Sequence, residues 1–428
     1  MLIIAVTMAG VTRHRELALF ALQAVGLSIL PLIAWKAAGK GHRSLIWPTT
    51  ILLLTVLVLL LQLVPIPFSM WIKLPGREIV AGSLELISAP PGARPLSLTP
   101  DKTVDALFWL IPPVIFFLGT AILSAPARIR MCTVFLTLMG AGLALGALQV
   151  TTDIQKVWSQ FDYFHPGLPI GFFANRNHQA IALAVCLPLL GALTRLWSER
   201  APGRQDLARM IWIGATGLIA VGMLATLSRA GSVLGSVALV LSLMIFAAPT
   251  VSVAGAGRRR VAVLIAVGVV VVVAQLGLGA VLSRFDNFAE TEGRFKFWPA
   301  ILAEAEHQQP FGSGTGSFDA VFRSVERTEN LGPNYVNEAH NEYLQLWMEL
   351  GLFFPILFGL FLVWVFWSGF RVFRHGPGAS QALGFAALSG ITVLLLHSVV
   401  DYPLRTQSLA VVFALLCGCL VMPPPRRS

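Results

Sequence analysis

The sequence predicts an all-α integral membrane protein, a polytopic bundle of about 11 (10–12) transmembrane helices. Hydrophobic residues make up 56% of the chain and charged residues 12%, and the mean hydropathy is +0.75. A soluble domain carries about 25% charged residues, so this chain has too little charge to cover a water-facing surface. Continuous runs rich in Leu, Ala, Val and Gly indicate helices, because the strands of membrane barrels are short and alternate in polarity.

The apolar runs divide the chain, taken as a single polytopic membrane domain over 1–428, into expected spans of the length that the bilayer core requires. We expect them at Leu17–Trp35, Leu45–Val64, Asp105–Leu123, Cys132–Val150, Gln179–Leu196, Met210–Leu227, Gly231–Thr250, Val261–Leu282, Gly351–Phe370, Ala382–Val400 and Ser408–Val421.

The start of the chain does not have the pattern of a cleaved signal. Met1–Gly10 is apolar but short, and charged residues from Arg13 to Glu16 follow it instead of preceding it. Every cysteine lies in an apolar run, which favours small membrane-buried side chains over a disulfide framework or a zinc site. These cysteines are Cys132, Cys186, Cys417 and Cys419.

Lysine and arginine are concentrated in alternate loops, which predicts the orientation of the bundle. One set of loops holds most of the basic residues and few acids, so we expect it to be cytoplasmic; it contains Lys36, Lys40, Arg43, Arg128, Arg130, Arg200, Arg204, Arg209, Arg258–Arg260, Arg371, Arg374, Arg426 and Arg427. The N-terminus would then lie outside, although Arg13 and Arg15 argue against this. A missed or re-entrant segment near the start would restore an inside N-terminus, and this alternative stays open.

The loops of the opposite face are longer and carry the residues suited to chemistry. They are Pro65–Pro100, Thr151–His178, the tight bend Ser228–Ala230, the large loop 283–349 and Asp401–Arg405. The cytoplasmic connections are too short for a catalytic domain. We therefore expect the site of this multi-pass membrane protein on the non-cytoplasmic face.

The large loop has predicted structure of its own. Arg294–Glu306 is expected to form an amphipathic helix, and Gly312–Gly316 a flexible turn. Helical character continues from Ala339 to Phe370, roughly 48 Å of helix and well beyond the ~30 Å hydrocarbon core. His340 would then lie in the first turn of a helix that begins outside the membrane, and Gly351 would allow a bend.

The net charge of +10 does not predict a nucleic-acid partner, because the charges fall in short clusters without a basic helix face. The pattern Gly312–Gly316 lacks the ending of a nucleotide-binding P-loop. The sequence has neither an Asp-x-Asp pair nor a His/Cys cluster with zinc spacing. We therefore expect no metal site and no cofactor.

Arginines near the outer ends of the spans are candidates for an anion site. Arg229 lies between two apolar runs with almost no loop, and a charge at the edge of the bilayer is a functional candidate, although a snorkelling residue is the structural alternative. Arg176 follows Asn175 and precedes Asn177, which suits a polar cluster at a helix start or, alternatively, a simple helix cap.

Arg294 and Arg284 belong to the large loop and the end of the span before it. Each is weak evidence by itself. Several arginines converging on one face would suit a diphosphate, because guanidinium groups bind phosphate oxygens with paired hydrogen bonds.

His340 is the strongest single candidate for a general base. It lies between Glu338 and Asn341 near a predicted helix start, and a nearby carboxylate can orient an imidazole. An interfacial histidine with a structural hydrogen bond is the alternative. His397 and Asp401 are spaced i, i+4 on one helix face, a pattern that favours a structural or supporting polar pair over a catalytic one.

The sequence resembles the O-antigen ligase/polymerase superfamily of bacterial envelope glycosyltransferases. The resemblance covers an O-antigen ligase-related region at 170–405. It depends on short motifs in a shared order, namely Gly171–Ala180 (GFFANRNHQA), Leu227–Gly231 (LSRAG), Gly293–Phe318, Glu338–Gly351 (EAHNEYLQLWMELG) and the closing stretch His397–Arg405 (HSVVDYPLR).

The resemblance implies a metal-independent transferase that faces the periplasm. Its donor would be a glycan on undecaprenyl diphosphate, and its acceptor a sugar hydroxyl of the lipid A core or of a growing polysaccharide, with membrane lipid around it. His340 would be the general base or would orient the acceptor. Arg176, Arg229 and Arg294 would hold the diphosphate and stabilise the leaving group.

Several alternatives remain open at this stage. The superfamily contains ligases, polymerases and protein O-oligosaccharyltransferases, and the motifs do not separate them. A transporter or flippase for lipid-linked sugar is a second class, although no internal repeat supports it. A non-catalytic scaffold is a third, and a common cavity for Arg176, Arg229, Arg294 and His340 would argue against it.

Overall fold

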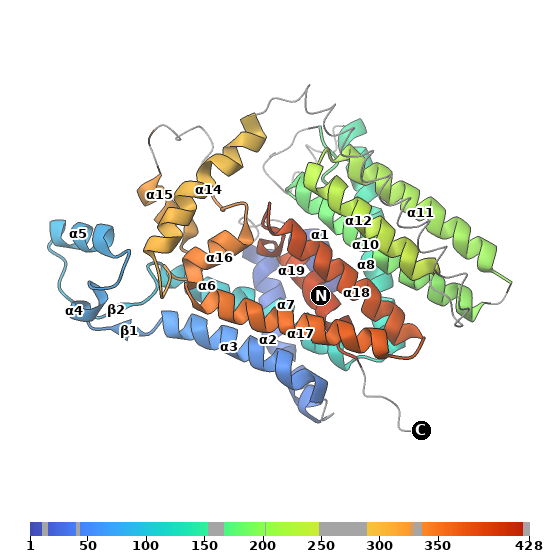
Figure 1. The fold of residues 1–428 in the computed structure, drawn as a ribbon, viewed down its shortest axis with the longest axis horizontal. Helices are drawn as coiled ribbons and strands as arrows, with labels where there is room; N and C mark the ends of the chain where they lie inside the picture. The colour runs from blue at the N-terminus through green and yellow to red at the C-terminus, as the bar shows by residue number, and fades with distance from the viewer. Residues whose placement is uncertain are drawn as a thin grey trace.

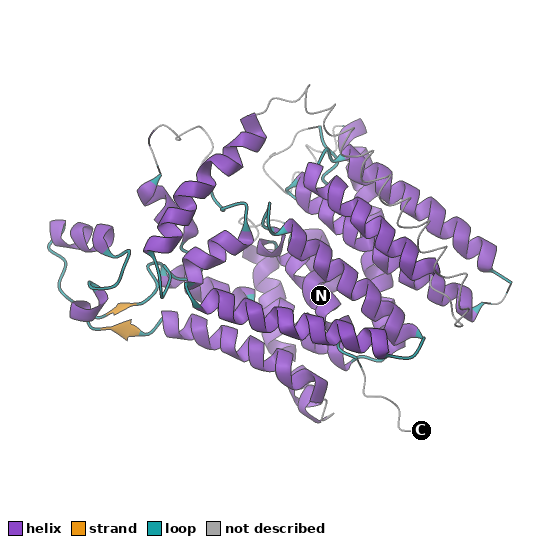
Figure 2. Ribbon diagram, viewed as in Figure 1, coloured by secondary structure: helices purple, strands orange, loops and turns teal. Residues whose placement is uncertain are grey.

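The computed structural model describes residues 1–10, 16–39, 43–152, 167–201, 203–247, 289–326, 328 and 336–422. Within these ranges the regular secondary structure is helical apart from one two-stranded sheet, and loops and turns connect the elements (Figure 2). The described part contains nine helices that are long and apolar enough to cross a membrane. The predicted all-α polytopic fold is therefore confirmed.

The count of eleven spans is not confirmed. The expected span Val261–Leu282 lies outside the described residues, and the last one, α19 (Gln407–Leu420), is a shorter apolar helix. The third expected span consists of α6 (Pro100–Trp109) and α7 (Ile111–Ile122). The other spans are α2 (Glu16–Gly39), α3 (Arg43–Gln62), α8 (Ala125–Thr151), α10 (Arg176–Arg200), α11 (Gln205–Ala225), α12 (Arg229–Ala247), α17 (Phe353–Arg374) and α18 (Ala379–His397).

Helix α10 is the centre of the bundle and packs against α11, α12 and α18 (Figure 1). Helices α10 and α12 are parallel and in close contact. The Ser242 hydroxyl of α12 donates to the Leu187 carbonyl of α10 at 2.6 Å, and a Cβ on Gly231 would collide with the side chain of Ala180. The two helices therefore begin side by side at the same end of the bundle, which we call the site end.

The first residues of the chain also enter the bundle. The short helix α1 (Leu2–Met8) is partly buried and packs against α19, where the Ser408 hydroxyl donates to the Ala5 carbonyl at 2.6 Å. The Ala174 amide donates to the Gly10 carbonyl at 3.2 Å. Residue 10 therefore lies at the site end, beside the segment that leads into α10.

A helical layer covers the site end next to α3, α6 and α17 (Figure 1). It comprises β1 (Pro65–Ile66), α4 (Phe68–Trp71), α5 (Glu78–Leu86), β2 (Arg94–Pro95), α14 (Ala289–His307), α15 (Phe318–Val325) and α16 (Glu342–Leu350). Arg77, between α4 and α5, connects this segment to the end of α14 and to the residue after β2. Its guanidinium donates to Gln308 Oε1 at 2.9 Å and to the Leu96 carbonyl at 2.6 Å. Burial lowers the pKa of Arg77 to about 10.

The large loop differs from its prediction in several places. Helix α14 begins at Ala289, before Arg294, and ends at His307. Gly312, Gly314 and Gly316 have positive φ and pack against other parts of the chain. Close packing, and not only a need for a flexible turn, therefore explains the glycines.

The prediction of one continuous helix from Ala339 to Phe370 is wrong. Gly351 adopts φ +57° against the Pro310 carbonyl and separates α16 from α17. The side chain of Asn341 caps α16 by accepting hydrogen bonds from the amides of Tyr343 and Leu344, each at 3.1 Å. His340 therefore precedes the helix and does not lie in its first turn.

Candidate functional site

Helices α10 and α12 begin in the same way at the site end. Asn175 caps α10 by accepting from the Asn177 amide at 2.8 Å, and Arg176 is the first residue of the helix. Ser228 accepts from the Gly231 amide at 3.2 Å, and Arg229 is the first residue of α12. Each helix therefore presents an arginine directly after its capping side chain.

A cation at a helix start is opposed by the charge of the helix end. The start of a helix carries a partial positive charge, so a cation there loses roughly 0.3–1 kcal/mol. Arg176 and Arg229 are both in this position on parallel, adjacent helices. Unpaired amides at helix starts and guanidinium groups together form a favourable environment for phosphate oxygens. An anion with several negative charges would reverse the penalty.

His340 itself and a residue close to Arg229 have left-handed backbone conformations. His340 has φ +49°, and Leu227, two residues before Arg229, has φ +55°. This region is uncommon for non-glycine residues and is a sparsely populated conformation for a bulky one such as leucine. Such strain is retained where the surrounding structure enforces it, and it is frequent at functional sites.

Asp401 connects the His340 segment to the start of α10. Its carboxylate lies 3.4 Å from His340 Nδ1, 3.7 Å from His397 Nε2 and 4.0 Å from His178 Nε2. It also accepts hydrogen bonds from Asn177 Nδ2 at 2.8 Å and from the Tyr402 amide at 2.9 Å. We call this group the Asp401 cluster.

Aromatic contacts complete the cluster. The ring of Tyr402 lies edge-on to the imidazoles of His178 and His340, with centroids 5.2 Å and 4.8 Å apart. The His340 side chain is 22% exposed, whereas the Asp401 side chain is 1% exposed. His340 is therefore the most exposed histidine of the cluster, and the buried Asp401 carboxylate contacts its imidazole on the inner side.

The pKa of the Asp401 carboxyl is well below its ordinary value. Burial alone would raise this pKa, but the hydrogen bond to His340 and the nearby imidazoles of His178 and His397 lower it further than burial raises it. Asp401 is therefore an ionised carboxylate at neutral pH. An ionised acceptor beside an imidazole orients the ring and stabilises the imidazolium that forms when the ring accepts a proton.

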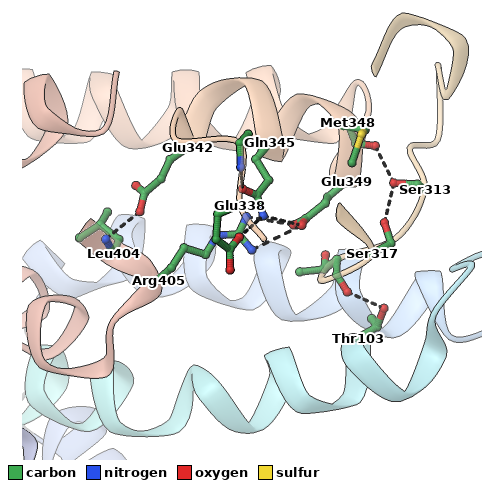
Figure 3. A network of polar contacts seen from close by, with 12 residues as sticks. Thr103, Ser313, Ser317, Glu338, Glu342, Gln345, Met348, Glu349, Leu404 and Arg405 are labelled. Atoms are coloured by element: carbon green, nitrogen blue, oxygen red, sulfur yellow. Dashed lines mark hydrogen bonds and ion pairs between the residues drawn. The ribbon is translucent and has the colours of Figure 1, made fainter. Parts of the chain in front are cut away.

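A second polar group lies between α16 and the turn after α18 (Figure 3). Arg405 pairs with Glu349 at 3.0 Å, and Gln345 donates to Glu338 at 2.6 Å and to Glu349 at 3.1 Å. Glu342 accepts from the Ser398 hydroxyl and from the Leu404 amide, each at 2.7 Å. We call Glu338, Glu342, Gln345, Glu349 and Arg405 the Arg405 cluster.

Burial and neighbouring charges set the pKa values of Glu342 and Arg405 in the Arg405 cluster. Burial raises the pKa of Glu342 to about 7, although the Ser398 hydroxyl and Arg405 act in the opposite direction. For Arg405, burial alone would lower the pKa, but Glu349 and Glu338 raise it above its ordinary value. This cluster fixes α16, and with it the adjacent His340, to the segment that carries Asp401.

The structure brings several of the predicted site residues together. Arg176, with Asn175 and Asn177, lies at the start of α10, Arg229 starts the neighbouring helix, and His340 reaches α10 through Asp401 and Asn177. The supporting residues have defined roles: Asn341 caps α16, and Glu338 belongs to the Arg405 cluster.

The structure describes only the backbone of Arg294 and does not describe Arg284. Arg294 lies on α14, one turn before Trp298, whose Nε1 donates to the Ala339 carbonyl at 3.1 Å. The backbone of α14 is therefore anchored next to His340, whereas the side chain of Arg294 lies outside what the structure describes. Arg284 also lies outside the described residues.

Some residues of the site were not singled out from the sequence. His178 and Tyr402 contribute to the Asp401 cluster, and Glu342, Gln345, Glu349 and Arg405 to the second cluster. Their positions within the quoted motifs were the available signal. Among the described residues, no group of three His, Cys, Asp or Glu side chains is arranged to hold a metal ion.

Fold and site together define a polytopic membrane protein with two arginines at adjacent helix starts and an oriented histidine at one end of its bundle. Residues 214–359 match the O-antigen ligase family model. This match supports the resemblance of the chain to the O-antigen ligase/polymerase superfamily. The matched segment includes Arg229, Arg294 and His340. A comparison with curated proteins finds no match.

Proposed function

We propose that the protein is a periplasm-facing, metal-independent glycosyltransferase of the bacterial inner membrane. It transfers or polymerises glycan from an undecaprenyl diphosphate-linked donor onto a sugar hydroxyl. One observation supports this proposal most strongly. Arg176 and Arg229 lie at adjacent helix starts, and His340, in contact with Asp401, lies at the same end of the bundle.

The donor diphosphate would bind at the starts of α10 and α12. Helix-start amides and bidentate guanidinium groups would hold its oxygens, and Arg294 on the adjacent α14 would add a further contact. The membrane-spanning helices that carry these groups would keep the lipid of the donor within the bilayer. The positive-inside distribution of loop charges supports a periplasmic position for the site end.

His340 would accept the proton of the acceptor hydroxyl. The acceptor oxygen then forms a bond to the anomeric carbon of the donor sugar, the bond from that carbon to the phosphate oxygen breaks, and the electron pair leaves with the lipid diphosphate. Fixed cations stabilise the negative charge on this leaving group. Asp401 stabilises the imidazolium until it releases the proton to water.

Reconstituted transfer tests the proposal. Purified protein receives an undecaprenyl diphosphate-linked repeat unit without nucleotide or added metal, once with a lipid A core acceptor and once without it. Products that lengthen without the core identify a polymerase, and transfer that requires the core identifies a ligase. Absence of a glycosylated product in both reactions contradicts the proposal and favours a transporter of lipid-linked sugar or a protein O-oligosaccharyltransferase.

A further inference from the structure

The ring of Tyr402 contacts the imidazoles of two histidines that come from different parts of the chain. Its centroid lies 5.2 Å from that of His178 and 4.8 Å from that of His340, with interplanar angles of 86° and 63°. His178 is the third residue of α10 and is 1% exposed, and Tyr402 is 8% exposed. The ring of Tyr402 therefore joins the buried start of α10 to the partly exposed His340.

The contact with Asp401 is too long to fix the His340 imidazole by itself. The carboxylate lies 3.4 Å from His340 Nδ1, whereas a charge-assisted hydrogen bond is about 2.7–2.9 Å long. The χ2 angle of a histidine has broad minima, so the ring turns easily about this bond. A single long contact leaves that rotation open, and a second contact is needed to hold the ring in one orientation.

Tyr402 supplies this second contact from a rigid segment. Its amide donates at 2.9 Å to Asp401 Oδ1, the same oxygen that faces His340 Nδ1. Tyr402 precedes the 3₁₀ helix η2 (Pro403–Arg405), whose last residue is held by the Arg405 cluster, and a proline restricts the backbone of the residue before it. One residue therefore fixes the carboxylate with its amide and flanks the imidazole with its ring.

We propose that Tyr402 is a positioning residue whose ring holds the imidazole of His340 in the orientation for proton transfer. The flat ring and not the phenol hydroxyl provides the restraint, because the contact joins the two rings. His178 supports Tyr402 from the start of α10. The consequence for transfer rests on the proposed function, whereas the restraint on the imidazole can be measured without any transfer activity.

The chemical reactivity of His340 tests the restraint directly. Diethylpyrocarbonate acylates accessible imidazole nitrogens, and mass spectrometry of the peptides gives the rate at each histidine. We compare the unmodified protein with Tyr402→Phe and Tyr402→Leu in nanodiscs. His340 should react about fivefold faster in Tyr402→Leu, within the range expected for loss of one aromatic pair, because its imidazole then turns toward water. Tyr402→Phe keeps the ring and should change this rate less than about twofold.

Two other histidines are controls within the same molecule. The side chain of His307 on α14 is 52% exposed outside the cluster, so its rate should be the same in every protein. His397 is fully buried, and its reaction would reveal that a variant has opened. If His397 reacts in Tyr402→Leu, His178→Leu decides instead, because it removes the ring that supports Tyr402 and should speed the reaction of His340 about threefold.

Reconstituted transfer shows whether the restraint serves the reaction. We expect Tyr402→Leu to lower kcat about fivefold with the KM for the lipid donor unchanged, because an interaction used in the chemical step and not in donor binding is lost. Tyr402→Phe should restore most of kcat. Phe311→Leu, at a phenylalanine of the helical layer that is 39% exposed, is the matched control and should leave both constants unchanged.

The outcomes separate this proposal from the proposed function. Unchanged reactivity of His340 in the folded leucine variant overturns the restraint, and an equal increase in Tyr402→Phe overturns it by assigning the effect to the hydroxyl. Normal kcat in Tyr402→Leu, or a rise in donor KM alone, overturns the positioning role and leaves the proposed function intact. Absence of transfer by the unmodified protein contradicts the proposed function, and the reactivity of His340 then decides the restraint independently.

Discussion

The Asp401 cluster and the Arg405 cluster are neighbours with opposite charge balances. In the first, a single buried carboxylate contacts the imidazoles of three histidines among the described residues. In the second, Arg405 faces the carboxylates of Glu338, Glu342 and Glu349 within the part of the chain that the structure describes. Glu342 links the two, because it accepts a hydrogen bond from Ser398 beside His397.

This difference predicts a structural role for the Arg405 cluster and a role in transfer for the Asp401 cluster. Glu342 and Glu349 are buried and bonded to fixed donors, so the second cluster is suited to holding α16 in place. In the Asp401 cluster the side chain of His340 is partly exposed on a strained backbone. Disruption of the Arg405 cluster should therefore affect folding, and disruption of the Asp401 cluster should affect transfer in a folded protein.

The largest expected effect is that of His340→Ala. Loss of a general base lowers the rate roughly 10²–10⁴-fold, so reconstituted transfer should fall to background while the protein still inserts and unfolds at the same temperature. His307→Ala is the control, because His307 is half exposed on α14 away from the cluster. Normal glycan transfer by His340→Ala would refute its assignment as the base.

Replacement of Arg405 with methionine should act on stability. It removes the cation that pairs with buried Glu349, and breaking a buried ion pair costs about 3–5 kcal/mol. We expect a lower thermal unfolding temperature in detergent and less folded protein after size-exclusion chromatography. Arg323→Met removes an exposed pair with Asp319 and should cost at most about 1 kcal/mol. Equal stability of both variants would contradict a structural role for Arg405.

Arg229→Lys should impair transfer while the protein remains folded. A lysine retains the charge but not the planar fork that binds two phosphate oxygens, so we expect kcat/KM for the lipid donor to fall roughly 10–100-fold. Arg209→Lys, at an exposed arginine paired with Asp206, is the matched control. Near-normal kinetics for Arg229→Lys would remove this residue from the diphosphate site.

Asp401→Asn should lower kcat about tenfold by loosening His340, a loss of about 1.5 kcal/mol for a hydrogen bond to a charged group. The KM for the donor should change little, because Asp401 does not contact the diphosphate in the proposed arrangement. Asp319→Asn on α15 is the control. A rise in donor KM without a change in kcat would show that Asp401 acts on binding instead of on His340.

The last expected effect concerns the pH dependence of stability. The pKa of Glu342 is raised from 4.5 to about 7, so between these values the folded protein binds more protons than the unfolded chain. Its contribution to stability is therefore present at low pH and is lost as the pH rises toward about 7. The difference in unfolding temperature between the unmodified protein and Glu342→Gln should shift in favour of the variant from about pH 5 to about pH 8.

The control for this titration is Glu306→Gln, because Glu306 is exposed on α14. Its difference from the unmodified protein should not depend on pH in this range. A pH-independent difference for Glu342→Gln as well would mean that the Glu342 carboxyl is not the group that titrates.

The sequence was sufficient for the architecture because hydrophobicity alone defines the spans. Runs such as Gln179–Leu196 lie within α10, and the expected termini differ by a few residues because polar first and last turns extend the helices. The break at Gly351 was not predicted as a helix end, because it depends on a contact with the Pro310 carbonyl from a distant part of the chain.

The sequence was less informative about the site. His340, Arg176 and Arg229 could be selected by residue type and position at helix starts, and their roles remain proposals. Asp401 and His397 were recognised as a pair four residues apart, but the link from Asp401 to His340 and Asn177 joins residues far apart in the sequence. The packing of α18 against α10 brings Asp401 to Asn177, and the contacts of α16 with the turn after α18 bring it to His340.

The most direct test of the account is a structure of the protein bound to undecaprenyl diphosphate in nanodiscs. We predict that the diphosphate lies at the starts of α10 and α12, with its oxygens within hydrogen-bonding distance of Arg176 and Arg229 and with His340 next to the outer phosphate. A diphosphate bound elsewhere, with Arg176 and Arg229 in contact only with protein, would contradict the account.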